Sequence, residues 1–229
     1  MSFQAKTDYF DLADDSTIVI VSSDENKSST VIQARDEKGD VVAQEIVGIT
    51  TAPSCSYVIK SNASTGEWKI GLPIVHDDKK YTISSIQINT GAGTPPSLQV
   101  SGEEVPATSH EDCYYDIPSA TVKVCHHAQI LWGAFTFTEG TGGCYLTQAN
   151  YTASGSLTKA QKDGETISYD ISEGKIEAAL TFVSTTGTKP TLTPGSGWTF
   201  TQELTKSEPD SDYNSYTCTL TKNLVHHTT

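Results

Sequence analysis

The chain has 229 residues and a formal net charge of −13, from 15 Lys and Arg against 28 Asp and Glu. At about 150 residues per domain, this length corresponds to one large domain or two small ones. No apolar run approaches the roughly 18 residues of a membrane span, so we expect no membrane association. Arg35 is the only arginine and no basic cluster occurs, which argues against nucleic-acid binding through a basic face.

The five cysteines are odd in number and widely spaced. This is typical of reduced thiols rather than of a secreted disulfide framework. Residues 1–8 contain no apolar stretch of the kind found in secretory signals. We therefore expect a chain whose thiols stay reduced in a cytoplasm.

The apolar stretches are short, rich in β-branched residues and bounded by turn residues. In chain order they predict strands at 17–21, 30–34, 41–47, 55–60, 67–72, 81–89, 98–100, 120–125, 129–138, 144–149, 166–171, 176–184, 198–204 and 213–224. Strands about ten residues apart with turns between them are typical of a sandwich or barrel. The sequence predicts an all-β fold with little helix, and 157–162 is the best short-helix candidate.

The last of these strands alternates clearly. Tyr216, Cys218 and Leu220 fall on one face, and the threonines between them fall on the other. Because successive side chains of a strand point to opposite faces, this pattern predicts a sheet that is packed on one side and wet on the other.

The strongest internal similarity relates residues 84–96 to residues 180–190, which share a β-rich run, a Thr-Gly turn and a proline. Further similarities relate Ser101-Gly102 to Ser196-Gly197, 115–122 to 213–220, 32–40 to 147–156, and 56–57 to 168–169. We interpret them as an internal duplication that produces two tandem β-sandwich or barrel domains, 1–126 and 127–229. Chance similarity between Ser/Thr/Gly-rich strands is the alternative.

Two groups of residues resemble metal sites without matching them. Residues Cys113, Cys125, His126 and His127 lack the Cys-x-x-Cys or His-x₃-His spacing of zinc ligands, and adjacent histidines on a strand point to opposite faces. Residues 210–214 begin like a calcium loop, but Ser215 replaces the turn glycine and Thr221 the bidentate glutamate. We expect surface histidines, including an exposed pair at 226–227, and no metal. The N-terminal arm has acidic residues that we expect to be solvated, Asp8, Asp11, Asp14 and Asp15.

No nucleophile elbow and no phosphate-binding glycine loop occurs in the sequence. We therefore expect no enzymatic activity, no catalytic residues and no cofactor. A hydrolase without a recognisable motif is an alternative that predicts a deep pocket with perturbed carboxylates. A second alternative is a carbohydrate- or surface-binding β-sandwich module, in which Trp68, Trp132 and Trp198 would stack on sugars; packing of these rings in the core is the default.

Residues 207–222 combine an acidic Asp-x-Asp-Tyr turn with an alternating Thr-rich strand. In this they resemble small structural proteins encoded in the tail-gene regions of tailed bacteriophages and prophages, and residues 33–43 have the same character. The resemblance implies a non-enzymatic virion structural protein, assembled in the bacterial host cytoplasm. It most closely implies a tail component of the tube, baseplate or completion type, with a tail-tube-like β domain that is here duplicated.

The resemblance also implies partners. We expect a homo-oligomer that contacts other virion proteins through sheet edges and long loops. In a tail tube, an acidic lumen would repel DNA and let it slide. A head-decoration protein is a further alternative.

Overall fold

The computed structural model describes residues 6–14, 16–106, 113–162, 165–207 and 213–227. Within these ranges the regular structure is β, apart from one 3-10 turn, η1, at Thr141–Gly143. The all-β prediction is confirmed. Nor does any described segment form a helix that is long and apolar enough to cross a membrane.

The strands range in length from two residues, as in β3, to the long strands of two hairpins. Their bounds are β1 (Ile18–Arg35), β2 (Val41–Ile59), β3 (Ala63–Ser64), β4 (Lys69–Ile70), β5 (Pro73–His76), β6 (Lys79–Gly91), β7 (Thr94–Val105), β8 (Tyr114–Asp116), β9 (Thr121–Val122), β10 (Phe135–Thr136), β11 (Cys144–Lys162), β12 (Glu165–Ser184), β13 (Thr193–Pro194), β14 (Thr199–Ser207), β15 (Asn214–Asn223) and β16 (His226–His227).

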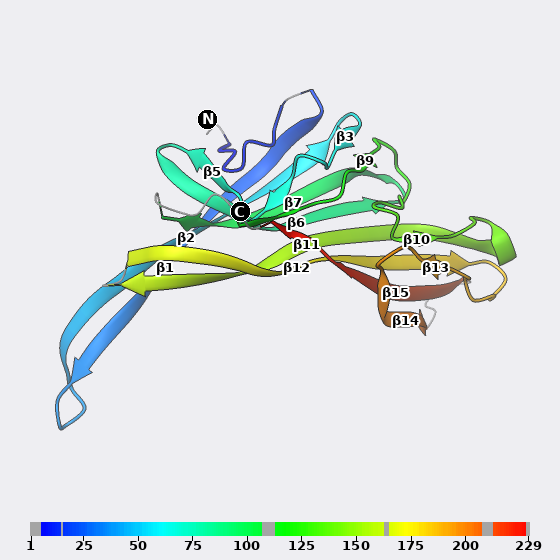
Figure 1. The fold of residues 1–229 in the computed structure, drawn as a ribbon. Helices are drawn as coiled ribbons and strands as arrows, with labels where there is room; N and C mark the ends of the chain where they lie inside the picture. Colours follow the sequence, from blue (N-terminus) through cyan, green and yellow to red (C-terminus); the bar gives the residue numbers. More distant parts are fainter. Residues whose placement is uncertain (1–5, 15, 107–112, 163–164, 208–212, 228–229) are drawn as a thin grey trace, which may run out of the picture.

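One antiparallel sheet runs through the whole molecule in the order β1-β2-β7-β6-β11-β12-β15-β14, and β5 pairs with β6 beside it (Figure 1). Three small sheets complete the fold: β3 with β9, β10 with β13, and β16-β8-β4. β16 lies at the end of the described chain and pairs with β8, so the last strand returns to the first half of the sequence.

Two long hairpins dominate the sheet. β1 pairs with β2 and β11 pairs with β12, each along nearly the full strand, and the β1–β2 hairpin extends well beyond the rest of the molecule (Figure 1). The sequence predicted four shorter strands in the first hairpin, separated by polar stretches such as 22–29. In the structure these stretches are continuous strands, β1 and β2. Their backbone hydrogen bonding continues through the polar stretches, where the side chains on both faces are exposed to solvent.

The helix predicted at 157–162 is wrong. These residues continue β11, where Leu157 pairs with Ile171 and Lys159 pairs with Tyr169 of β12. Ala, Gln and Lys are good helix formers, but intrinsic propensity is a weak determinant, and pairing with a neighbouring strand overrides it here.

The two long hairpins have corresponding irregularities. A register shift lies between Ile20 and Ser22 in β1, and one lies between Leu146 and Gln148 in β11. A second shift lies between Ser29 and Thr30 in β1 and between Ser154 and Ser156 in β11. A third follows Ala34 in β1 and Ala160 in β11, at the same distance along each strand from the first. Because bulges bend and twist a strand locally, the two hairpins are deformed at corresponding points.

The strands that follow each hairpin also correspond. β7 pairs with β2 and β6, and β15 pairs with β12 and β14, so each four-stranded set has the same order. A bulge lies at Ser84 in β6 and at Thr201 in β14. In both bulges the hydroxyl donates to a carbonyl of the next strand: Ser84 to Ser101 at 3.2 Å and Thr201 to Thr219 at 3.3 Å.

This correspondence matches β1 with β11, β2 with β12, β6 with β14, and β7 with β15. It differs from the sequence similarity described above, in which residues 84–96 of β6 and β7 align with residues 180–190. Residues 180–184 end β12, which occupies the position of β2. The Ser/Thr/Gly similarity therefore relates strands that hold different positions in the sheet.

The two faces of the sheet are chemically distinct. Residues that pair directly across strands share a face. One row from β1 to β14 is apolar and mostly buried: Ile20, Tyr57, Leu98, Ile88, Tyr151, Ala178, Leu220 and Phe200. A neighbouring row on the opposite face is polar, and each of its residues is exposed or half-buried: Ser22, Ser56, Gln99, Gln87, Thr152, Glu177, Thr221 and Thr199.

The predicted alternation of the last strand is confirmed, because Tyr216, Cys218 and Leu220 are buried in β15. The small sheets and their connecting segments pack on this apolar face, which makes the arrangement sandwich-like. Gly155 in β11 shows how close the layers are: a Cβ there would lie 2.8 Å from Ile171 Cγ1 and 3.2 Å from Ile70 Cγ2. Ile70 belongs to β4, so this short strand sits directly on the main sheet.

Candidate functional site

The outer strands of the main sheet, β1 and β14, are the most distinctive surfaces of the molecule. Each has one strand partner among the described residues, so its outer edge presents a row of backbone N–H and C=O groups. Their outward-facing central segments are polar and exposed: Asp24, Glu25, Asn26 and Lys27 in β1, and Gln202, Glu203, Thr205 and Lys206 in β14.

The interior of the sheet shows how two such edges fit together. β6 and β11 occupy the same positions in their four-stranded sets as β14 and β1, and they pair with each other from Ser85 with Ser154 to Gly91 with Gln148. Thr90 Oγ1 also donates to the Ala149 carbonyl at 3.1 Å. The described part of the chain therefore contains one edge pair that is joined, β6 with β11, and one edge pair of the same type, β14 and β1, that is not joined.

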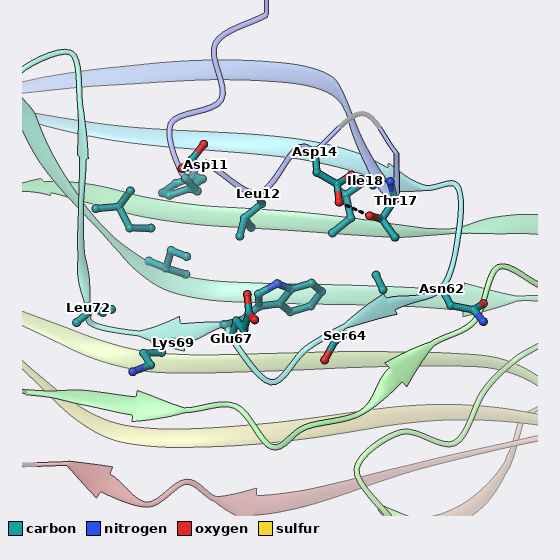
Figure 2. Close-up of a pocket in the computed structure, with 15 residues that line it drawn as sticks. Asp11, Leu12, Asp14, Thr17, Ile18, Asn62, Ser64, Glu67, Lys69 and Leu72 are labelled. Atoms are coloured by element: carbon teal, nitrogen blue, oxygen red, sulfur yellow. Dashed lines mark hydrogen bonds between the residues drawn. The ribbon is translucent and has the colours of Figure 1, made fainter.

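A groove lies between the N-terminal segment and the β3–β4 turn (Figure 2). It encloses about 580 Å³. Its floor is apolar, with Trp68 and Ile83 among the lining residues, and its rim holds the charged residues Asp11, Glu67 and Lys69. No histidine or cysteine is among the described residues that line it, and its ionisable side chains are the carboxylates of Asp11, Asp14 and Glu67 and the amine of Lys69.

Asp14 on the rim of this groove is used structurally. Its carboxylate accepts hydrogen bonds from the backbone N–H groups of Thr17 at 2.5 Å, Ile18 at 3.0 Å and Ser16 at 3.0 Å, and from the Thr17 hydroxyl (Figure 2). The Thr17 hydroxyl and these N–H groups hold the pKa of Asp14 well below its usual range. The carboxylate fixes the turn that leads into β1.

We predict that Asp14→Asn destabilises the protein most at neutral pH. A carboxylate whose pKa is lowered by folding stabilises the native state above its unfolded pKa, and this stabilisation is lost as pH falls. The difference in unfolding free energy between Asp14→Asn and the natural protein should be at its largest above about pH 5 and should become smaller below about pH 4. Urea unfolding across this range measures it. Asp170→Asn, at an exposed position of β12, serves as the control, and a difference that is constant with pH would contradict the prediction.

The rest of the N-terminal arm is packed rather than solvated. Phe10 is 1 % exposed, and a Cβ at Gly102 of β7 would overlap its ring. The Tyr57 hydroxyl donates to Asp8, whose other carboxylate oxygen accepts from the Ala13 N–H at 2.7 Å. Burial, followed by this hydrogen bond, raises the pKa of Tyr57. The expectation of a solvated arm is therefore wrong for Asp8, which is half-buried, whereas Asp11 and Asp14 are exposed. Asp15 lies outside the described residues.

The residues considered as zinc ligands do not converge. His126 and His127 are exposed, and Cys113 and Cys125 are half-buried. In the described part of the chain, no three His, Cys, Asp or Glu side chains are placed to hold a metal ion. Of the calcium-like segment, 210–212 lie outside the described residues.

The C-terminal histidines are exposed, as expected, but they also form β16. His227 Nε2 lies 2.7 Å from Asp116 Oδ2, and its ring stacks on Tyr114 with centroids 5.0 Å apart. His226 stacks on Tyr115 at 4.6 Å. These contacts attach the end of the described chain to β8.

The tryptophans are packed into the fold rather than arrayed on the surface. Trp68 and Trp198 are 6 % and 4 % exposed. Trp132 is half-buried, donates from Nε1 to Thr65 Oγ1 at 3.1 Å and lies edge-on to Tyr151. Core packing was the default expectation for these rings, and it holds for Trp68 and Trp198.

All five cysteines are free, and three of them, Cys55, Cys144 and Cys218, are buried. Burial raises the pKa of the Cys55 thiol and raises that of Cys218 to about 11. Because the thiolate is the reactive form, we predict that a thiol reagent labels half-buried Cys113 and Cys125 first in the native protein.

Labelling followed by mass spectrometry tests this order. The three buried thiols should react at the rate of unfolding or local opening, and all five should react in denaturant. Rapid native labelling of Cys55 or Cys218 would contradict their placement in the core.

No protein-family model matches this sequence, and a search of curated proteins finds no significant relative.

Proposed function

We propose that this chain is a non-enzymatic structural protein of a virion, acting through contacts with copies of itself and with other virion proteins. A tail component of the tube, baseplate or completion type fits best. The observation that carries the proposal is the construction of the sheet. Two four-stranded sets of the same order are joined edge to edge, and the outer edge at each end pairs with no further strand among the residues that the structure describes.

In this proposal the two sets are copies of one unit, related by an internal duplication within 1–126 and 127–229. The matching bulges in β1 and β11, and the matching hydroxyl–carbonyl bonds at Ser84 and Thr201, support it. The division between the parts falls between β9 and β10, so each part contains one complete set. They share one sheet and one core rather than standing apart as separate bodies.

The projecting β1–β2 hairpin is the natural contact with a neighbouring layer or a different virion protein. It carries apolar side chains that are unusually exposed, with Val31 at 42 %, Val41 at 44 % and Val42 at 64 %. Arg35 at the same end donates to the Gly39 carbonyl at 2.8 Å, which stiffens the turn. A stiff tip with exposed valines suits a protein–protein contact.

The open face of the sheet suits a structural surface better than an active site. The polar row from Ser22 to Thr199 presents hydroxyl and amide groups and one carboxylate, that of Glu177. The net charge of −13 is therefore not concentrated along this row. If the face lines a channel, its lining in this row is polar and carries one charged side chain, that of Glu177.

Light scattering of the purified chain over a wide concentration range, followed by negative-stain electron microscopy, tests the proposal. We expect particles whose mass is a multiple of 24.6 kDa and whose images show rings or short tubes. Antibodies against the chain should label the tails of virions that carry its gene. A protein that stays monomeric at the highest concentration and labels no virion would overturn the proposal.

A further inference from the structure

We propose that β14 of one copy pairs with β1 of the next copy, antiparallel and in the register that the chain already uses between β6 and β11. This inference rests on the proposed function, because it names the surfaces through which copies assemble. The partner is a second copy of this chain, and the interface is continuous sheet rather than a side-by-side contact.

The register follows from the structure in two steps. β1 takes the place of β11, because the bulge after Ile20 corresponds to the bulge after Leu146. Tyr151 of β11 therefore corresponds to Glu25 of β1, and Ser154 corresponds to Ser28.

β14 takes the place of β6 in the same way. The bulge at Thr201 corresponds to the bulge at Ser84, so Gln202 corresponds to Ser85. Beyond a second irregularity in β14, Lys206 pairs with Tyr216 as Ile88 pairs with Leu98. Lys206 therefore takes the place of Ile88.

Within the chain, Ile88 pairs with Tyr151 and Ser85 pairs with Ser154. Between copies, the same register brings Lys206 opposite Glu25, and Gln202 opposite Ser28. Two residues towards the C-terminal end of β1 from Glu25, Lys27 faces the irregular segment of β14 that contains Glu203.

The charges in this register are complementary. Lys206 faces Glu25, and Glu203 faces Lys27, so each strand offers one residue of each sign in reversed order. In the isolated chain, Glu25 Oε2 is 3.1 Å from Lys27 Nζ on its own strand. Opposite charges directly across an antiparallel pair are favourable, whereas like charges are unfavourable, so the pattern selects this register over a shifted one.

The interface is head-to-tail, because the edge used on one copy differs from the edge used on the next. Repetition of such a contact forms a ring when the rotation closes. The residues that meet are polar and charged, in contrast to Ile88 and Tyr151 at the internal junction, so we expect assembly that weakens as salt concentration rises. The edge charges also protect the free chain from indiscriminate strand pairing.

A pair of introduced cysteines tests the register directly. Directly opposed residues of antiparallel strands have Cα atoms about 4.5–5.5 Å apart, within disulfide range. We expect Glu25→Cys with Lys206→Cys in the full chain to give disulfide-linked oligomers under mild oxidation. Glu25→Cys with Gln202→Cys is the matched control, because Gln202 lies about three residues, or about 10 Å, out of register. The single variants measure background from the native thiols.

Charge reversal tests the same contact without a covalent link. Lys206→Glu and Glu25→Lys should each weaken association about 2- to 30-fold, and the double variant should recover most of it. Lys189→Glu, at an exposed position away from both edges, has the same charge change as Lys206→Glu and should leave association unchanged.

The outcomes separate this inference from the proposed function. If the natural chain assembles but the Glu25/Lys206 cysteine pair links no better than the Glu25/Gln202 control, the edge contact is wrong while the structural role stands. If the natural chain does not assemble at all, both fail. Preferential linking of the opposed pair, with recovery by the double charge reversal, supports both.

Discussion

Replacing Phe182 with alanine is expected to lower the free energy of unfolding by about 3–5 kcal/mol. Phe182 in β12 is fully buried. Its ring meets Phe137 at 5.0 Å and Phe135 at 6.1 Å between centroids, both edge-on. Removing the ring leaves a cavity between the main sheet and the layer above it, and Phe135 loses its partner.

Urea unfolding measures this change, with Ile167→Ala on the same strand as the matched control. Ile167 is 51 % exposed, so its truncation should cost less than about 0.5 kcal/mol. If the two variants lost similar stability, the packing of β10 and its flanking loop on β12 would be contradicted.

Gly195→Ala is expected to have the second large effect. Gly195 follows β13, and a Cβ there would overlap the carbonyl oxygen of Gly133. The Gly195 N–H also donates to the Ala134 carbonyl at 2.9 Å. Because the obstacle is backbone, β10 and β13 must separate, and we expect a loss at or above the upper end of about 1–3 kcal/mol.

Gly91→Ala in β6 is the matched control for this substitution. A Cβ at Gly91 would lie 3.4 Å from the Thr147 carbonyl oxygen, which is an ordinary contact. Thermal unfolding of both variants should show a clear loss of stability for Gly195→Ala and a small one for Gly91→Ala. Equal melting temperatures would contradict the close approach of the two segments.

Local patterns were sufficient to predict the fold class. The short β-branched stretches and turn residues predicted strands, and Tyr216, Cys218 and Leu220 alternate into the core as the sequence indicated. These predictions succeed because a strand packed on one face must place apolar side chains at every second position.

The long hairpins could not be predicted in the same way. Residues 22–29 of β1 are polar throughout, and nothing in their composition separates a wet ribbon from a loop. The segment 157–162 was misassigned for the same reason, because its pairing partner in β12 decides its conformation. Both errors concern strands that are stabilised by a neighbour rather than by an apolar face.

Sequence similarity was also a poor guide to the internal correspondence. The residues that resemble one another most, 84–96 and 180–190, lie in strands with different positions in the sheet. The corresponding points, such as the bulges at Ser84 and Thr201, share backbone geometry and a hydroxyl donor rather than a recognisable motif. The pairing register of the strands therefore shows which positions of the two four-stranded sets correspond, whereas residue identity does not.

The candidate assembly edges were missed for a related reason. Glu25, Lys27, Glu203 and Lys206 are ordinary surface charges in the sequence, and their order becomes meaningful only when β1 and β14 are known to be outermost. An alternation of opposite charges within a strand-forming stretch was the available signal. It could not be interpreted without the register.

A cryo-electron microscopy map of the assembled protein is the most direct test of this account. We predict that the sheet continues from β14 of one subunit into β1 of the next, with Lys206 opposite Glu25. A map in which the outer edges of β1 and β14 both face solvent, or in which subunits meet only through the projecting tip of the β1–β2 hairpin, would contradict it.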